Sequence, residues 1–204
     1  MDVLTRERFP HRAEALADRY PEIRSILNGH GMPPYWKRPE RYETLFRIIL
    51  EQQVSVRSAA TLAKRVEAEL GGLSARRVAA AGAEGLRELG LTRAKARSSA
   101  TLAEAVRSRS LRLGRLREAS TEVLIAELTR WPGIGPWTAW TYTLLAQARA
   151  DAWPPGDLAL RRAIEELLPA SDVDQLTATG GRWQGERGIA ARLLWHFYLS
   201  TRAR

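Results

Sequence analysis

The chain has 204 residues, 45% of them hydrophobic, which is enough for one large domain or for two small lobes that share a core. It contains no cysteine and only three histidines, so we expect no disulfide, no cysteine-held zinc or iron–sulfur cluster and no histidine metal site. No apolar run approaches the roughly 18 residues of a membrane-spanning helix and residues 1–12 lack a signal-peptide core, so we expect a cytoplasmic protein.

Helical periodicity dominates the first half of the chain. Apolar residues over 45–52 share one helix face with Gln52 at its end, and a second amphipathic pattern over 59–72 stops at two glycines. A short pattern over 86–90 also ends at a glycine, and an Ala-rich segment over 94–106 predicts a longer helix. These segments predict a series of short helices with glycine stops.

The second half continues in the same way. Ser120 or Thr121 opens a helix that ends near Arg130. Valine and isoleucine never gather into the alternating pattern of strands, so we predict an all-α fold of about ten short helices. The remaining helices are expected over 138–148, 158–168 and 190–199.

Residues 1–204 are expected to form a single domain with two helical lobes. The helices from about residue 43 to 117 would form lobe 1, and residues 1–42 together with 118–204 would form lobe 2. A groove between the lobes would place a Gly-x-Gly turn near residue 134 and Asp157 at its edge.

The net charge of +9 comes from 32 Lys and Arg against 23 Asp and Glu, and it indicates a polyanionic partner. Almost all of the positive charge is arginine, whose forked guanidinium suits phosphate geometry; Lys37, Lys64 and Lys95 are the three lysines. A basic surface that serves solubility, or GC-rich codon usage, explains the same composition, so charge alone does not decide between these readings.

A glycine-rich turn, Trp131–Gly135, separates two predicted helices. Gly133 and Gly135 permit φ > 0 and let a phosphate approach without a Cβ in the way, and Pro136 suits the first turn of the next helix. The N–H groups and the dipole at that helix start both favour an anion, so the segment predicts a clamp for DNA phosphate. An ordinary glycine-closed turn is the alternative, because a lone Gly-x-Gly is weak evidence.

A second motif, Pro154–Asp157, follows about twenty residues later. The two prolines force an extended approach, Gly156 allows a bend, and Asp157 then caps the helix that begins at Leu158. Capping is the most common role for Asp at this position, and it is compatible with catalysis. The helix start favours a charged carboxylate, which can stabilise the positive sugar formed when an N-glycosidic bond breaks and can orient or deprotonate water.

The two motifs together resemble the helix-hairpin-helix and Gly/Pro–Asp signature of base-excision DNA glycosylases, the HhH-GPD superfamily. The segment Ile49–Ser55 resembles the corresponding segment of the 3-methyladenine DNA glycosylase II (AlkA-like) branch. The resemblance runs from about Pro21 to Phe197 and implies two helical lobes with a DNA-binding groove between them. AlkA-like enzymes often carry an N-terminal β-rich domain, which we do not expect in this chain.

The resemblance also implies roles for single residues. Asp157 would be the catalytic aspartate, and Gln53 would be the wedge that fills the gap left by a flipped base. Thr141 stands where a relative has a pocket tyrosine, which Trp140 or Tyr142 could replace, and Arg187 resembles an arginine near the final helix. The residues implied to line the base pocket are Trp137, Trp195, Trp140 and Tyr142. Those implied to hold DNA phosphate are Gly133, Gly135 and Thr138. The carbonyls implied to bind a structural Na⁺ or K⁺ ion are those of Thr129, Trp131 and Ile134.

Tryptophan suits a pocket for damaged bases because an alkylated purine is cationic and its face attracts an indole. Stacking recovers about 1–3 kcal/mol per base. Core packing is the competing reading for each tryptophan. The pocket reading is favoured for Trp137 by its place beside the hairpin and for Trp195 only by the resemblance, whereas core packing is favoured for Trp140.

Trp137 occupies the position at which bifunctional relatives carry the lysine that forms a Schiff base. An indole cannot form one, so the resemblance implies a hydrolase without lyase activity and without a catalytic cofactor. The remaining candidates are assigned structural roles: Asp151 and His196 in packing, and Asp172 and Asp174 in helix capping.

The sequence therefore predicts a monofunctional, monomeric DNA glycosylase that acts on double-stranded DNA. It would flip out alkylated bases such as 3-methyladenine and 7-methylguanine and hydrolyse their N-glycosidic bonds, with no membrane partner. The chain would work in the bacterial cytoplasm, associated with the nucleoid through DNA. The alternative is a non-catalytic helix-hairpin-helix module, which would bind DNA through its phosphates without leaving an abasic product.

Overall fold

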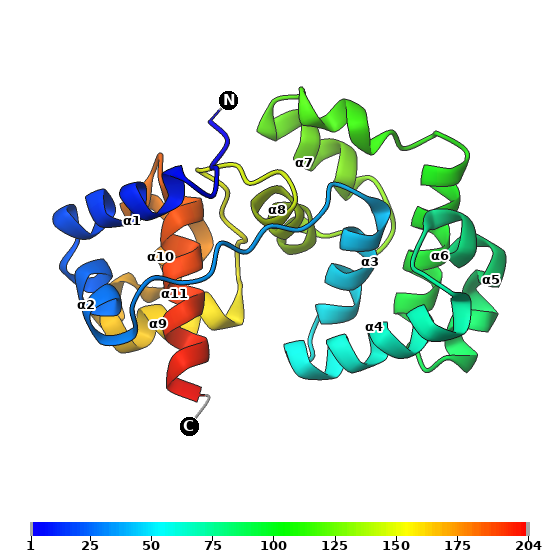
Figure 1. The fold of residues 1–204 in the computed structure, drawn as a ribbon, viewed down its shortest axis with the longest axis horizontal. Helices are drawn as coiled ribbons and strands as arrows, with labels where there is room; N and C mark the ends of the chain where they lie inside the picture. Colours follow the sequence, from blue (N-terminus) through cyan, green and yellow to red (C-terminus); the bar gives the residue numbers. More distant parts are fainter. Residues whose placement is uncertain (1, 203–204) are drawn as a thin grey trace. The chain divides into compact units, whose positions relative to one another are not determined.

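The computed structural model describes residues 2–202, and within them the chain forms eleven α-helices (Figure 1). The only β feature of this part is an isolated bridge between Val3 and Arg149, so the predicted all-α class is confirmed. The α-helices are α1 (Arg8–Arg19), α2 (Pro21–His30), α3 (Tyr42–Glu51), α4 (Val56–Leu70), α5 (Ala75–Glu88), α6 (Arg93–Arg107), α7 (Thr121–Thr129), α8 (Pro136–Leu145), α9 (Leu158–Leu167), α10 (Val173–Thr179) and α11 (Arg187–Arg202). Short 3₁₀ helices lie over Leu113–Arg117, Ala170–Asp172 and Gly181–Trp183.

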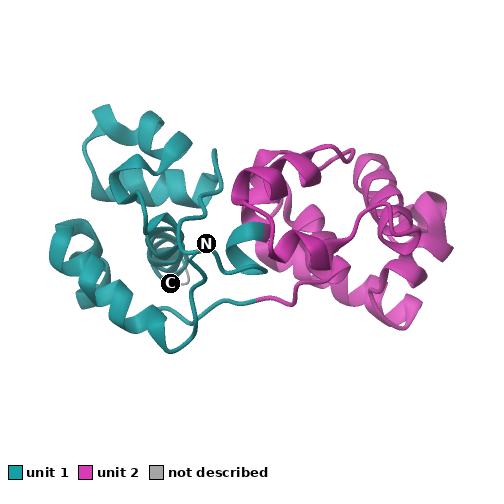
Figure 2. Cartoon of the chain, turned by 90° about the horizontal axis from the view of Figure 1, so that it is seen from above, with its two compact units in different colours: residues 1–37, 143–204 teal, residues 38–142 magenta. Residues whose placement is uncertain are grey.

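The chain divides into two compact units, coloured separately in Figure 2. Unit 1 comprises Met1–Lys37 and Thr143–Arg204, and unit 2 comprises Arg38–Tyr142. The boundary in the second half of the chain falls inside α8. Residues 118–142, which the sequence analysis assigned to the second lobe, group with residues 38–117 instead.

Unit 2 is built around α3, the helix with a nearly continuous apolar sequence. Seven of its ten residues are buried, so it presents side chains to neighbours on several faces. The helices around it begin at Ser or Thr side chains that accept a backbone N–H three residues later and so satisfy the open end of each helix. These caps are Ser55 for α4, Ser74 for α5, Thr92 for α6 and Ser120 for α7.

Unit 1 is built around α11, which packs against α9, α2 and α1. The first half of α11 is continuously buried, from Gly188 to Leu194. Arg192 lies in this stretch with no exposed surface and donates hydrogen bonds to the carbonyls of Gly188, Trp36 and Leu144. Its burial lowers the pKa of the guanidinium to about 10.

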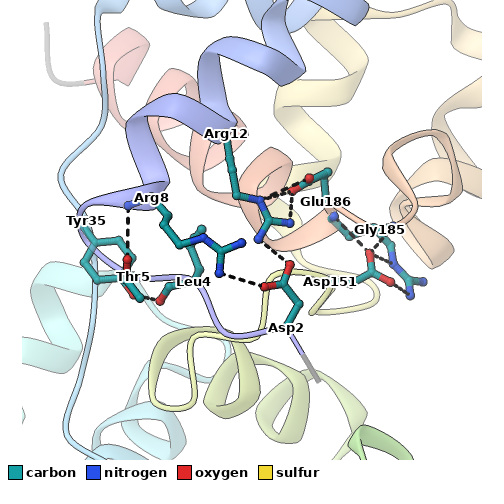
Figure 3. Close-up of polar contacts among 10 residues, drawn as sticks. Asp2, Leu4, Thr5, Arg8, Arg12, Tyr35, Asp151, Gly185 and Glu186 are labelled. Atoms are coloured by element: carbon teal, nitrogen blue, oxygen red, sulfur yellow. Dashed lines mark hydrogen bonds and ion pairs between the residues drawn. The ribbon is translucent and has the colours of Figure 1, made fainter.

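The N-terminal segment is held to the rest of unit 1 by backbone hydrogen bonds and by ion pairs, and Figure 3 shows the ion pairs of Arg8 and Arg12. Leu4 N–H donates to the carbonyl of Ala148, and Ala150 N–H donates to that of Asp2. Arg12 then joins the Asp2 carboxylate to that of Glu186, at 2.5 and 2.7 Å. These contacts place α1 beside the start of α11. Within residues 2–202, no helix is long and apolar enough to cross a membrane.

Candidate nucleic-acid interface and active site

The predicted hairpin is present in unit 2, where Arg130–Gly135 link the end of α7 to the start of α8. Gly133 has φ +79°, and a Cβ at this position would lie 2.0 Å from the Ser98 hydroxyl oxygen. Glycine is therefore required here both by the backbone and by the close approach of α6. Gly135 differs from the prediction because its φ is not positive. A Cβ there would have no atom within 4 Å, so the turn is open to an approaching group at this residue.

Gln52, at the C-terminal end of α3, stabilises the hairpin through its side chain. Its amide nitrogen donates to the carbonyl of Gly133 and to the Thr138 hydroxyl, both at 2.9 Å. The Thr138 side chain is 2% exposed, so it faces Gln52 and not an outside ligand. The sequence analysis missed this role of Gln52. A polar residue closing an otherwise apolar helix face was the signal that could have revealed it.

The predicted wedge lies on the loop between α3 and α4, which we call the wedge loop (Gln52–Ser55). Gln53 is exposed and has φ +57°, a left-handed conformation that is uncommon for residues other than glycine. Val54 beside it is 47% exposed. Strained, exposed positions of this kind persist only where their surroundings hold them, and they cluster at functional sites.

Lys95 of α6 fixes the base of the wedge loop. Its ammonium donates to the carbonyls of Leu50 and Gln52, both at 2.8 Å, where the end of α3 leaves carbonyls without helical partners. Partial burial lowers the pKa of Lys95. The cation also complements the negative end of the α3 dipole.

The aromatic residues of unit 2 separate into two groups. Trp137 and Trp140 of α8 are half-buried, so each keeps part of its ring surface accessible. Tyr142 is completely buried, and within the described residues its hydroxyl has no hydrogen-bond partner. Burial raises its pKa. Tyr142 is thus a core residue of unit 2 and offers no ring face to a base.

The three carbonyls implied to bind a cation lie at the end of α7 and in the turn after it. Thr129 is the last residue of α7, and the Trp131 carbonyl accepts a hydrogen bond from Ile134 N–H at 3.1 Å. Neutral carbonyl oxygens at the negative end of a helix suit a hard monovalent ion. Within residues 2–202, His, Asp and Glu form no cluster that could hold a metal.

Asp157, in unit 1, stands at the N-cap of α9 as predicted. Its Oδ1 accepts a hydrogen bond from Leu160 N–H at 2.9 Å and one from the Trp195 indole N–H at 3.1 Å. The residue is 7% exposed. Two donors on one oxygen fix the orientation of the carboxylate. Trp195, expected as a stacking residue, therefore also positions Asp157.

The loop that carries Asp157 is anchored on a single carbonyl of α10. Trp153 indole N–H and Gly156 N–H both donate to the Thr177 carbonyl, at 3.1 and 3.3 Å. Gly156 has φ +69°, the left-handed bend that a residue with a Cβ avoids. Trp153 is buried against Trp183, with ring centroids 5.7 Å apart. The role of Trp153 in supporting this loop was not predicted from the sequence.

Asp151 has a structural role, as predicted. Its carboxylate accepts hydrogen bonds from Gly185 N–H and Arg187 N–H, at 2.7 and 3.2 Å, and so closes the start of α11 (Figure 3). The Arg187 guanidinium binds the same carboxylate through two nitrogens, at 2.8 and 2.6 Å. Arg187 is thus engaged inside unit 1.

Three further polar residues can be compared with their predicted roles. His196 is half-buried and its ring nitrogen is 2.9 Å from the His30 carbonyl oxygen, which confirms a packing role. The capping prediction was wrong for Asp172, which stands at the N-cap of α10 without a side-chain cap hydrogen bond. It was also wrong for Asp174, which pairs with Arg161 at 2.8 Å.

The excess positive charge is concentrated in the unit that carries the hairpin. Unit 2 holds 18 of the 32 Lys and Arg residues but only 11 of the 23 Asp and Glu residues. Unit 1 is close to balanced. An excess of positive charge in one unit is the distribution expected of a protein that binds nucleic acid.

Comparison with known proteins identifies the family. The chain is 29% identical over 188 residues to the probable bifunctional transcriptional activator/DNA repair enzyme AlkA of Mycobacterium tuberculosis, covering 86% of this chain and 37% of the relative. It is 29% identical over 169 residues to DNA-3-methyladenine glycosylase 2 of Escherichia coli, covering 77% and 57%. The chain thus spans less than two thirds of either relative.

The fold is shared with solved structures. A 3-methyladenine DNA glycosylase of Schizosaccharomyces pombe in complex with abasic DNA superposes with a TM-score of 0.74 at 22% identity, covering 93% of this chain and 96% of that one. Residues 46–179, which include the hairpin and Asp157, match the family described as HhH-GPD superfamily base excision DNA repair protein. The chain therefore belongs to the HhH-GPD superfamily of base excision DNA repair proteins.

Proposed function

We propose that the protein is a monofunctional DNA glycosylase that removes alkylated bases, with 3-methyladenine and 7-methylguanine as the first substrates to test. The observation that carries the proposal is the Asp157 carboxylate. It is nearly buried, held by Leu160 N–H and the Trp195 indole, and it belongs to the segment that matches the family. A carboxylate fixed before the reaction begins can stabilise developing positive charge without the cost of reorganisation.

The reaction follows from the chemistry of the damaged base. An alkylated purine carries a positive charge and leaves the sugar readily, so little protonation of the leaving group is needed. As the N-glycosidic bond breaks, the electron pair goes to the base and the sugar becomes an oxocarbenium-like cation, which Asp157 stabilises. Water then adds to the sugar and gives up its proton, with Asp157 orienting it or accepting that proton. The products are the free base and an abasic site.

Unit 2 supplies the residues that hold the DNA. Gly133, Gly135 and the first turn of α8 receive a backbone phosphate, with Thr138 contributing its backbone N–H because its side chain is engaged by Gln52. Gln53 enters the space left by the flipped base. The indole faces of Trp137 and Trp140 stack on the electron-poor base. A stacking role is also proposed for Trp195 of unit 1.

A monovalent cation is part of this proposal. The carbonyls of Thr129, Trp131 and Ile134 would hold Na⁺ or K⁺ where α7 ends, and the ion would supply positive charge near the bound phosphate. Catalysis itself uses no cofactor. We assign the activity to a monomer because one chain contains both the carboxylate and the hairpin.

The decisive experiment is the substitution Asp157→Asn, which keeps the shape of the side chain and its ability to accept the two hydrogen bonds. Release of 3-methyladenine and 7-methylguanine from methylated duplex DNA should fall by at least about 100-fold, because the charge that stabilises the sugar cation is gone. Binding to DNA with an abasic-site analogue should persist. Release at the wild-type rate by Asp157→Asn would overturn the proposal.

Two alternatives predict different products. A non-catalytic helix-hairpin-helix module would bind duplex DNA with a steep salt dependence and leave every base in place. A glycosylase with lyase activity would cut the strand and be trapped on DNA by borohydride. Lyase activity requires an amine, and by its resemblance to the family Trp137 stands at the position where lyases carry lysine. Lys95, on the same unit, is engaged with two backbone carbonyls.

A further inference from the structure

We infer that Gln52 is a positioning residue that couples the wedge loop to the hairpin, so that holding a phosphate and filling the gap left by a base are performed by one rigid element. This inference rests on the proposed function. Gln52 itself touches neither the scissile bond nor the base in this scheme. Its amide acts through Gly133, Thr138 and the adjoining Gln53.

The coupling begins with one nitrogen that serves two parts of the hairpin. Gln52 Nε2 donates to the Gly133 carbonyl, in the turn, and to the Thr138 hydroxyl, in the first turn of α8, both at 2.9 Å. These two acceptors stand on either side of Gly135, where the turn is open. The residue that follows Gln52 in the chain is Gln53, so one peptide bond separates the hairpin's support from the wedge.

Helix α6 contacts both the wedge loop and the hairpin. Lys95 binds the carbonyls of Leu50 and Gln52 at 2.8 Å, and Ser98 lies directly against Gly133. Lys95 and Ser98 are three residues apart and so share a helix face. The wedge loop and the hairpin are therefore bonded to each other and are both seated on α6, within a single unit of the chain.

This arrangement answers a mechanical requirement. Extruding a base costs a few kcal/mol of lost pairing and stacking, and the wedge must resist the duplex as it tends to close again. Gln53 is exposed and held at φ +57°, a conformation that an unsupported loop would leave. The Gln52 and Lys95 bonds fix the residue before it. A force on Gln53 is thereby transmitted to the turn that grips the backbone phosphate.

The test compares Gln52→Leu, which keeps the bulk of the side chain but loses both donors, with wild type and with Gln175→Leu. Gln175 is exposed on α10 of unit 1 and serves as the matched control. The first measurement is hydrogen–deuterium exchange in the free protein. Coupling predicts faster exchange in Gln52→Leu at residues 52–55 and at 131–138 together, with the rest of unit 2 unchanged. Unchanged exchange at 131–138 would overturn the inference whether or not the protein is a glycosylase.

The second measurement is single-turnover release of 7-methylguanine from duplex DNA and from the same strand without its complement, where no base pair opposes flipping. The rate of release by Gln52→Leu should fall about tenfold or more on the duplex and little on the single strand. A variant that is merely misfolded would show an equal fall in rate on both substrates. Equal loss on both substrates, or none, contradicts the coupling. A wild-type protein that releases no base contradicts the proposed function instead, and the exchange measurement still decides the coupling.

Discussion

At the scale of single residues, the contact between Trp195 and Asp157 combines two tasks in one side chain. The indole N–H donates to Oδ1 of Asp157 at 3.1 Å, while the ring of Trp195 is only half-buried and keeps accessible surface. The ring N–H therefore orients the carboxylate, and in the proposed function the side chain also stacks on the base. A tryptophan suits this position better than another aromatic residue because its only polar atom is a donor.

The substitution Trp195→Phe separates these tasks, since it keeps an aromatic ring and removes the donor. A hydrogen bond to a charged group is worth about 1.5–3 kcal/mol, so the maximal rate of base release should fall about 10- to 100-fold. Affinity for DNA should change little. Single-turnover release at saturating enzyme checks this prediction.

Trp140→Phe is the matched control, because Trp140 lies on α8 in unit 2 and not on the element that holds Asp157. It should alter affinity for the damaged base and leave the maximal rate of base release unchanged. An identical loss of maximal rate in both variants would show that Trp195 acts only as a stacking surface.

At the scale of elements, the hairpin combines a glycine that the fold requires with a glycine that the fold alone does not require. Gly133 lies at φ +79° against Ser98, whereas Gly135 has no positive φ and faces open space. The two positions look equivalent in sequence. Because their surroundings differ, substitution by alanine is expected to have different effects at the two glycines.

Gly133→Ala should therefore destabilise the protein, and Gly135→Ala should not. The first places a Cβ in a left-handed conformation, which costs about 1–2 kcal/mol before the clash with Ser98 is counted. The second adds a methyl group only where a phosphate would approach, so it should weaken DNA binding while the unfolding free energy stays at the wild-type value. Urea unfolding and a DNA titration at fixed salt measure the two effects. Equal destabilisation by both substitutions would contradict this distinction.

At the scale of the whole molecule, two buried tyrosines contribute to how stability responds to alkaline pH. Burial raises the pKa of both Tyr42 and Tyr142 above the ordinary value. The folded protein therefore keeps two protons that the unfolded chain releases above pH about 10. Their contribution to stability is fully present below that pH and is lost as the pH rises further.

Between pH about 9 and about 11 the two tyrosines lower the unfolding free energy as the pH rises, and each Tyr→Phe substitution should remove its share of that decrease relative to wild type. Tyr42→Phe also loses the hydrogen bond to the Ser99 carbonyl at 2.9 Å, so it should lower stability at neutral pH by about 1 kcal/mol. Tyr142→Phe removes a hydroxyl that has no partner within the described residues, so it should be neutral or stabilising. Chemical denaturation of both variants at a series of pH values tests these predictions. If the slope of the unfolding free energy against pH is the same in a variant as in wild type, the substituted tyrosine does not contribute to the alkaline response.

Local patterns allowed much of this molecule to be predicted from its sequence. Helix starts at Ser120, Pro136 and Asp157 were expected and are present because capping and proline preferences act within a few residues. The kink that Gly82 introduces in α5, with φ +63°, was not foreseen. Neither were α1 and α2 as separate helices.

Local sequence patterns were sufficient to predict the all-α class, the hairpin, the N-cap position of Asp157 and the family, because each is encoded within a short run of residues. The side chains that support these motifs could be identified only from the packing of the helices. Gln52 meets Gly133 across 81 positions, Trp195 meets Asp157 across 38, and Tyr142 is enclosed by the core. Such contacts depend on how helices pack, and the same residue types at the same spacing could have faced solvent.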